Sequence, residues 1–343
     1  MPIATNERMH STAKIEEPLH SIELPYQIRR VECSPYEWSH NVICIAFDGK
    51  VAIGVTKFQE EEETLDVKFD LELLQDFIVE SRVECMALSP EISVSTLPKS
   101  IIFACATADF KIRLFSSNLI DPHSEQVYEE HTSYINSIAY ESCGDNLAST
   151  GDDLSVRIWS TNEHQCHTVL FLQSPGMSVC WHAEEPGKLL VAEKRGTITV
   201  FNVERKQAIL SFDADCGPLT AADWSTCNSL RVAALVDGHL LVWDTTRASQ
   251  PLMKRAVHPG GGRFLRYSQL NENIIATVGQ PNHTLSITHA NLKFPMASTL
   301  LKVSVLNIFF HSLSQNELST TYLIFSVSFH SLFNLFAGFF TQF

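Results

Sequence analysis

Three residues of the kinds that bind metals lie close together in the segment HQCHTV, where His164, Cys166 and His167 fall within four positions. Imidazole and thiolate groups are the usual ligands of zinc, which takes four of them in a tetrahedron. The segment has the character of a strand, however, and consecutive strand residues point to opposite faces, so Cys166 and His167 do not converge easily. No second pair of such ligands lies nearby. We therefore expect no metal site.

A glycine-rich segment beside an arginine, HPGGGRF at 258–264, has residues that can cradle a phosphate. It lacks the GxxxxGK[ST] spacing, and no helix is expected after it to supply backbone amides. Its composition is typical of a flexible loop between structural units. Neither GxSxG nor HExxH occurs in the chain, although nucleophilic triads are also built from distant residues. We expect neither a cofactor nor catalytic activity.

The charge balance limits the classes of partner. The 343 residues include 39 acidic and 25 basic side chains, a net charge of −14. Binding to a phosphate backbone requires a surface rich in Lys and Arg, so direct nucleic-acid binding is not expected. Nine scattered cysteines without a CxxC motif indicate reduced core thiols and an intracellular compartment. The N-terminal segment is polar with mixed charge, so we expect no signal peptide.

A turn residue followed six positions later by an aromatic residue recurs along the middle of the chain. The pairs are Asp109 with Phe115, Asp153 with Trp159, Arg195 with Phe201, and Asp237 with Trp243. The aromatic residues lie 44, 42 and 42 positions apart, which is the period of one four-stranded propeller blade. Fainter copies at 48–54 and 282–288 flank the series. The repeat predicts an all-β propeller in which six blades are traceable.

The elements that must position these pairs are short antiparallel strands. Each blade buries the apolar faces of its alternating strands against the neighbouring blades. Aspartate suits the turn between two inner strands because it tolerates turn backbone and bonds nearby amides. The aromatic residue then falls at the far end of the outgoing strand, where we expect it to pack between blades.

The segment 129–160 resembles a full WD repeat and places the chain among proteins similar to WD-repeat propellers. By that resemblance, His131, Ser149, Asp153 and Trp159 would form a buried hydrogen-bonded set that ties the outer turns of a blade together. Such a network stabilises a protein only when every member is satisfied. The pattern departs from the family at Glu130 and Ser160, and the resemblance implies that the blade with Arg195 lacks the network.

A narrower resemblance rests on six short segments in a fixed order. They are TKFQEEEE (56–63), ADFKIRLFSS (108–117), SPGMSVCWH (174–182), LLVAEKRGTI (189–198), QAILSF (207–212) and VWDTTRASQP (242–251). Together they resemble the small WD-repeat nucleoporin family of the Y-shaped scaffold complex of the nuclear pore. The resemblance implies a non-catalytic scaffold subunit in the nucleus, at the nuclear envelope and nuclear pore, which supports pore assembly and transport. It also implies docking beside a large helical subunit and a kinetochore role in mitosis.

The match to that family ends near residue 296, and the segment 297–343 differs in composition. It holds nine of the 21 phenylalanines, and Lys302 and Glu317 are its only charges. Three interpretations are open: a membrane-spanning tail anchor, a rebuilt last blade, or a replaced terminus. Because turn punctuation is lacking and Ser, Thr, Asn, Gln and His are interleaved, we favour the replaced terminus. Contact with a membrane is expected only if this tail inserts.

The resulting domain plan has a flexible N-terminus at 1–17, a propeller at 18–296 and the atypical tail at 297–343. The propeller follows a seven-bladed plan with the last blade missing or disrupted. An N-terminal strand usually completes the last blade of WD-repeat propellers, and the segment 20–33 is the candidate here. Without strands to receive it, we expect the closure of the ring to be compromised.

A run of four glutamates could contact a partner, and one motif raises an alternative function. The run is Glu60, Glu61, Glu62 and Glu63, which is typical of a solvated loop but could also meet a basic patch on a partner. The rival is a substrate receptor of a ubiquitin ligase, since such propellers commonly carry a Trp-Asp-x-Arg motif. The segment WDTTR (243–247) has one residue too many for that motif.

Overall fold

The computed structural model describes residues 20–57, 70–247, 250–281, 284–292, 295–300, 304–315, 318–328 and 333–340. Within these ranges the chain forms 28 strands and one short 3-10 helix, η1 (Glu37–Ser39). The predicted flexible segment 1–17 and the acidic run Glu60 to Glu63 both lie outside the described residues. Among the residues that are described, no helix is long and apolar enough to cross a bilayer.

Six antiparallel sheets follow one another along the chain, each made of four consecutive strands. The first three comprise β2 (Ile28–Cys33), β3 (Val42–Phe47), β4 (Lys50–Lys57) and β5 (Asp70–Ile78); β6 (Val83–Leu88), β7 (Ile101–Thr107), β8 (Ile112–Ser117) and β9 (Ser124–Tyr128); and β10 (Ile135–Tyr140), β11 (Asn146–Gly151), β12 (Ser155–Ser160) and β13 (Gln165–Phe171). The next three comprise β14 (Gly176–Trp181), β15 (Lys188–Glu193), β16 (Thr197–Asn202) and β17 (Gln207–Asp213); β18 (Leu219–Trp224), β19 (Arg231–Val236), β20 (His239–Asp244) and β21 (Met253–Ala256); and β22 (Gly262–Tyr267), β23 (Ile274–Gly279), β24 (Thr284–His289) and β25 (Ala297–Leu300).

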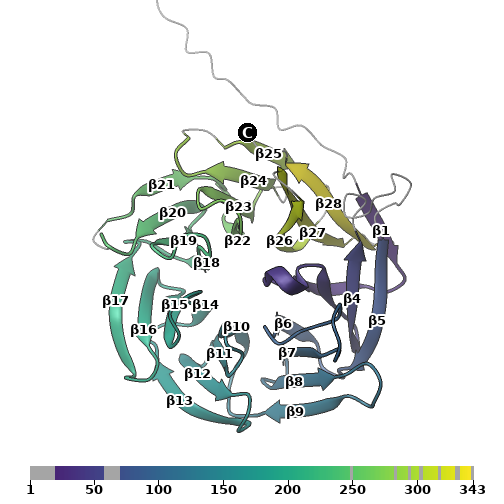
Figure 1. The fold of residues 1–343 in the computed structure, drawn as a ribbon. Helices are drawn as coiled ribbons and strands as arrows, with labels where there is room; N and C mark the ends of the chain where they lie inside the picture. Colours follow the sequence, from purple (N-terminus) through teal and green to yellow (C-terminus); the bar gives the residue numbers. More distant parts are fainter. Residues whose placement is uncertain are drawn as a thin grey trace, which may run out of the picture.

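The sheets stand in a ring around a central opening, and the first strand of each sheet lies nearest to that opening (Figure 1). First strands of successive sheets contact one another, as β6 contacts β10 and β10 contacts β14. This arrangement is a β-propeller, and it confirms the all-β fold and the six blades traced from the repeat. Because neighbouring strands of a sheet run antiparallel, the loops after the first and third strands of every blade lie on one face of the ring.

The apolar core lies between the blades. Trp159 of the third blade packs in one cluster with Ala104, Leu114 and Tyr128 of the second blade. Its ring stacks on Tyr128 with the two centroids 4.8 Å apart. The same interfaces carry hydrogen bonds that span one repeat, such as the backbone amide of Val179 donating to Ser137 Oγ, 42 positions away. The repeat of 42–44 residues in the sequence is therefore the number of residues that separates equivalent positions in adjacent blades.

A seventh four-stranded sheet occupies the remaining place in the ring. It contains β26 (Ser304–Gln315), β27 (Leu318–Ser328), β28 (Phe333–Phe340) and, at its outer edge, β1 (His20–Leu24). The N-terminal strand thus pairs with β28, antiparallel, in the place expected for it. The expectation that the tail would offer no strands to receive it is wrong. The segment lacks turn signals but is rich in Phe, a residue that favours strands.

Candidate functional site

The third blade brings His131, Ser149, Asp153 and Trp159 together in one chain of hydrogen bonds. His131 Nδ1 lies 2.7 Å from Asp153 Oδ2, and His131 Nε2 lies 2.7 Å from Ser149 Oγ. Trp159 Nε1 donates to the same hydroxyl oxygen at 2.8 Å. The side chains of His131 and Asp153 are 1% and 3% exposed, so no substrate can reach them from outside. The three residue types of a nucleophilic triad, Ser, His and Asp, are in contact here, but they are buried between strands.

The charge of Asp153 is held by its neighbours. Burial alone would raise the pKa of Asp153, but the hydrogen bond from His131, helped by one from Ser155, holds that pKa at about 2. The Ser155 hydroxyl donates to Asp153 Oδ1 at 2.8 Å, and the Thr132 amide donates to Oδ2 at 3.3 Å. The carboxylate therefore joins the loop before the blade to the turn between its second and third strands.

The other two Asp–aromatic pairs lie in equivalent turns without such a set. Asp109 accepts hydrogen bonds from Thr107 Oγ1 and, at 2.8 Å, from Arg113 Nη2. Phe115 is fully buried and stacks on Phe103 with centroids 5.1 Å apart. In the fifth blade Asp237 has an exposed side chain and a positive φ of 45°. Trp243 is buried, and its Nε1 meets no hydrogen-bond partner within the described residues.

The two segments that were considered as a metal site and as a phosphate loop, HQCHTV and HPGGGRF, have side chains that contact neighbouring residues of the fold. His167 Nε2 lies 2.9 Å from Asn146 Oδ1, His164 occupies a turn with a φ of 56°, and Cys166 is half-buried. No group of three or more His, Cys, Asp or Glu side chains able to hold a metal occurs in the described ranges. His258, from the glycine-rich loop, is buried with its Nε2 2.9 Å from Thr277 Oγ1. Burial lowers the pKa of His258 to about 4.

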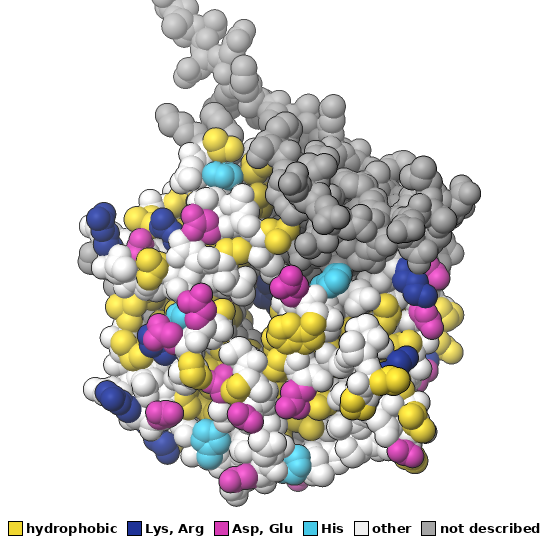
Figure 2. Space-filling model, viewed as in Figure 1, with side chains coloured by type: hydrophobic (Ala, Val, Ile, Leu, Met, Phe, Trp, Pro, Cys, Tyr) yellow, Lys and Arg dark blue, Asp and Glu magenta, His cyan; other side chains and the backbone are white. Residues whose placement is uncertain are grey.

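The face formed by the loops after the first and third strands, called the loop face below, carries exposed apolar side chains around its centre. The short helix η1, drawn in purple, lies beside the central opening (Figure 1). Trp38 belongs to this helix and is 59% exposed. Its Nε1 donates to the carbonyl of Pro90 at 2.9 Å, and its ring stacks on Tyr36 with centroids 5.3 Å apart. Figure 2 looks onto this face and shows acidic side chains outnumbering basic ones around the opening.

The central channel holds a cavity of about 490 Å³. The third and fifth residues of the first strands of blades one to six line it. On blades two to five the third residue is small: Cys85, Ser137, Ser178 and Ala221. Blades one and six contribute large or charged residues, so the lining is asymmetric and the space lies toward the small residues.

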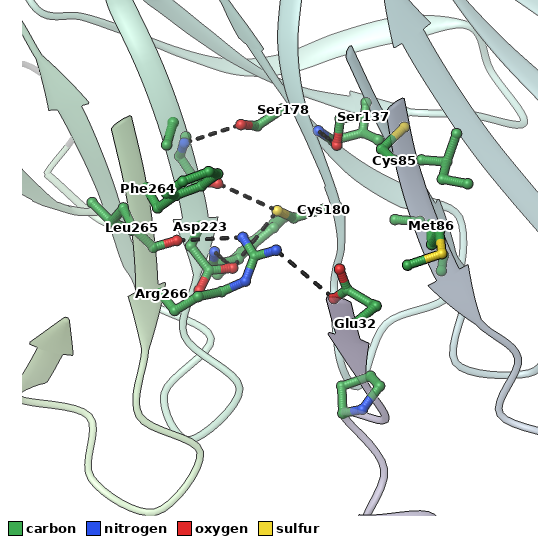
Figure 3. A pocket seen from close by; sticks show the side chains of 18 of the residues that line it. Glu32, Cys85, Met86, Ser137, Ser178, Cys180, Asp223, Phe264, Leu265 and Arg266 are labelled. Carbon is green, nitrogen blue, oxygen red and sulfur yellow. Dashed lines mark hydrogen bonds and ion pairs between the residues drawn. The ribbon is translucent and has the colours of Figure 1, made fainter. Parts of the chain in front are cut away.

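A charged cluster crosses the middle of the channel (Figure 3). Arg266 Nη2 of β22 lies 3.9 Å from Glu32 Oε1 of β2. Burial works against the charge of Arg266, yet Glu32 and Asp223 hold its pKa above the usual value. Burial raises the pKa of Asp223, although the backbone amide of Tyr267 donates to Asp223 Oδ2 at 2.8 Å. The cluster thus links blades one, five and six by electrostatics.

Known proteins provide the context for this geometry. A model of the WD domain, G-beta repeat, matches residues 123–160. The chain is 40% identical to human nucleoporin Nup37 over 271 residues, covering 78% of this chain and 82% of that one. The chain belongs to the Nup37 family of nucleoporins. It is also 38% identical to mouse Nup37 over 270 residues, which cover 78% of this chain and 82% of that one, and 32% identical to the Drosophila melanogaster protein over 292 residues, which cover 83% and 89%.

Sequence reasoning found the blade turns of this Nup37 family member but missed its channel. Three of the charges that line the channel, Glu32, Asp223 and Arg266, each stand at the fifth position of a first strand. That shared position is a signal in the sequence, since a charge on the inward face of a strand needs an aqueous or paired environment. Trp38 was missed because it lies in a loop outside the repeat pattern.

Proposed function

We propose that the chain is a non-catalytic scaffold subunit of the Y complex of the nuclear pore, docking on a large helical nucleoporin. The observation that carries this is the 32–40% identity to nucleoporin Nup37 of three animals over about four-fifths of the chain. In this proposal the protein supports pore assembly and nucleocytoplasmic transport, needs no cofactor, and joins the kinetochore in mitosis.

The loop face is the docking surface we propose for the helical subunit. Tryptophan is enriched at binding hot spots, and Trp38 combines 59% exposure with a side chain fixed by stacking and by its bond to Pro90. A side chain that is already ordered loses little entropy on binding. Leu97 and Ile120, which are 87% and 88% exposed, are further apolar side chains on loops of the second blade that belong to the same face.

Acidic side chains around this area indicate the charge of the partner. Glu37, Glu91, Glu184 and Glu272 lie on loops that follow first strands, and Figure 2 shows the preponderance of acidic groups. Rim charges of one sign steer a partner of opposite charge and act mainly on the association rate. We therefore propose a helix surface that presents apolar side chains flanked by Lys or Arg.

A binding assay with matched aromatic variants tests the proposal. The full chain, immobilised, is incubated with purified Y-complex subunits, beside Trp38→Ala and a control, Tyr134→Ala. Tyr134 is 45% exposed in the loop before β10, on the opposite face. We expect Trp38→Ala to weaken capture of the helical subunit about tenfold or more, as hot-spot truncations do, and Tyr134→Ala to leave it unchanged. Equal capture by both variants would contradict the assignment of the loop face, and no capture by the unmodified chain would contradict the scaffold role.

The rival role as a ubiquitin-ligase substrate receptor is not favoured. Its motif would require Trp243 and Asp244 to be followed by an arginine two positions after the aspartate, and the arginine stands at 247. Recovery of a ligase adaptor in place of nucleoporins in the same assay would reverse this preference.

A further inference from the structure

The face opposite the loop face carries four apolar side chains on the second and third blades, which are neighbours in the ring (Figure 1). They stand at or after the ends of strands that finish on this face: Phe110 follows β7, Tyr134 follows β9, Leu154 follows β11, and Phe171 is the last residue of β13. These four residues are called the turn patch below. Exposed apolar side chains that gather on one part of a surface commonly mark an interaction site.

One aromatic contact and two backbone hydrogen bonds order the turn patch. The rings of Phe110 and Tyr134 meet edge to face with their centroids 5.0 Å apart. The backbone amide of Asp152 donates to the carbonyl of Tyr134 at 2.8 Å, and the amide of Leu172 donates to the carbonyl of Leu154 at 2.8 Å. The turns are therefore tied to one another before a partner binds, so binding orders little that was mobile.

Phe171 is 84% exposed, although its strand belongs to a packed blade. Leu170 and Leu172 flank it and are buried in the core cluster between the third and fourth blades. Because successive strand residues point to opposite faces of a sheet, the ring of Phe171 points away from that core. Its partner in the strand register is Ser155, the residue after Leu154. A partner that covered Phe171 would recover the free energy of burying an aromatic ring.

Two members of the turn patch hold a backbone conformation that favours glycine. In each of blades one to five, the last residue of the turn between the second and third strands has a positive φ. Blades one, four and five have glycine there, with φ values of 82°, 107° and 71° at Gly49, Gly196 and Gly238. Blades two and three have Phe110 and Leu154, with φ values of 67° and 59°. A side chain with a Cβ is strained in this region, and strained residues cluster at binding sites.

Charged side chains beside the turn patch are paired within the chain. Each of three ion pairs has one member in the turn after β7 or the loop after β9: Lys111 Nζ with Glu129 Oε1 at 2.7 Å, Arg113 Nη2 with Asp109 Oδ2 at 2.8 Å, and Arg157 Nη1 with Glu130 Oε2 at 2.6 Å. The acidic loop face differs in this respect (Figure 2). Charge complementarity therefore favours a partner surface that is apolar and carries little charge.

We propose that the turn patch binds an amphipathic helix of a partner protein, through apolar side chains on one side of a helix whose flanks carry few charges. The backbone amides of Asp152 and Leu172 are already bonded within the chain, so recognition falls to side chains. A helix that lies on a surface presents its residues i, i+3, i+4 and i+7 in a row, which suits apolar groups that follow one another across two blades. This partner differs from the Lys- or Arg-flanked helix proposed for the loop face, and the proposal does not depend on the role at the nuclear pore.

Fluorescence anisotropy with a labelled synthetic helix tests the turn patch on the full chain. The probe is an uncharged peptide of about five helical turns with leucine at i, i+3, i+4 and i+7 and with alanine and glutamine elsewhere. A peptide of the same composition in scrambled order lacks the apolar side. The variants are Phe171→Ala and Leu154→Gly. The controls are Trp38→Ala on the loop face and Ile209→Ala, which removes a side chain that is 53% exposed on β17.

We expect the amphipathic peptide to bind the unmodified chain, and Phe171→Ala and Leu154→Gly each to weaken that binding about tenfold or more, as truncation of a central contact does. Both controls should bind as the unmodified chain does. Raising the salt from about 0.1 M to about 1 M should change the affinity by less than about twofold, because few charges take part. A thermal scan should show no lower unfolding midpoint for Leu154→Gly, since glycine adopts the left-handed conformation without strain.

Several results would overturn the proposal. They are no binding of the amphipathic peptide, equal binding of the scrambled one, undiminished binding by Phe171→Ala, and weakening by Trp38→Ala alone. A lower unfolding midpoint for Leu154→Gly would assign that leucine to the stability of the fold and would contradict its place in a binding surface. Dimerisation of the unmodified chain in sedimentation velocity, abolished by Phe171→Ala, would assign the turn patch to a second copy of the chain instead.

Discussion

Replacing Asp153 with asparagine isolates the charge of the hydrogen-bonded set in the third blade. Asparagine has the size of the protonated acid and can still accept a hydrogen bond from His131, so the variant removes the negative charge and little else. The charge is stabilised in the fold because the pKa of Asp153 is about 2, against an ordinary value of 3.8. At about 1.36 kcal/mol for each pKa unit, the folded state favours the ionised form by roughly 2 kcal/mol.

The sign of the pH dependence follows from the same shift. A carboxyl whose pKa is lower in the folded chain contributes its stability above the unfolded pKa and loses it as the pH falls through the folded pKa. The Asp153→Asn variant should therefore be less stable than the parent by roughly 2 kcal/mol at pH 7. The difference should shrink below about pH 4 and disappear only below about pH 2, where the parent carboxyl is protonated in the folded chain as well.

Urea unfolding followed by tryptophan fluorescence measures this difference at pH 7 and again at decreasing pH. Asp237→Asn is the matched control, because Asp237 occupies the equivalent turn of the fifth blade with an exposed side chain, and its replacement should change stability by less than about 0.5 kcal/mol. Equal losses for the two variants would refute the reasoning, since the effect would then belong to the turn and not to His131. So would a loss at Asp153 that does not depend on pH.

Three further outcomes are expected. Ser149→Ala should cost about 1–3 kcal/mol in urea unfolding, because it leaves the buried N–H of Trp159 without its acceptor and His131 Nε2 without its hydroxyl partner; a loss below about 0.5 kcal/mol would contradict this. In the unfolded chain His258 takes up a proton below about pH 6.5, whereas in the folded chain it stays neutral down to about pH 4. The free energy of unfolding should therefore decrease as the pH is lowered from about 6.5 to about 4, and His258→Gln should make it depend less steeply on pH in that range. Truncation after residue 303 removes the strands that pair with β1 and should lower the thermal midpoint and increase aggregation in light scattering; an unchanged midpoint would mean that the seventh sheet does not close the ring.

The sequence was informative where structure is local and repeated. The six residues from Asp153 to Trp159 span one turn and one strand. Their recurrence every 42–44 positions indicates equivalent units stacked side by side, and this period predicted the propeller. The tail was misjudged because strands were inferred from the turn residues between them, and residues 304–315, 318–328 and 333–340 form strands although such turn residues are sparse. The high content of Phe in this segment was the better guide there, because aromatic residues favour strands.

The channel could not be reconstructed from local pattern because its contacts join the ends of the ring. Glu32 and Arg266 meet only because the first and sixth blades lie on either side of the seventh. Gln269 Nε2 likewise donates to the carbonyl of Pro35 at 3.1 Å, across 234 positions of sequence. Such pairs have no spacing rule, since the distance between them depends on the number of blades and the curvature of the whole ring.

Quantitative mass spectrometry of the complex that co-purifies with the tagged full chain from nuclear envelopes tests the central claim most directly. We expect nucleoporins of the scaffold to be recovered in a fixed proportion to the chain, with a large helical subunit at about one copy per copy of the chain. Recovery of the chain without nucleoporins, or with a ubiquitin-ligase adaptor in their place, would contradict it.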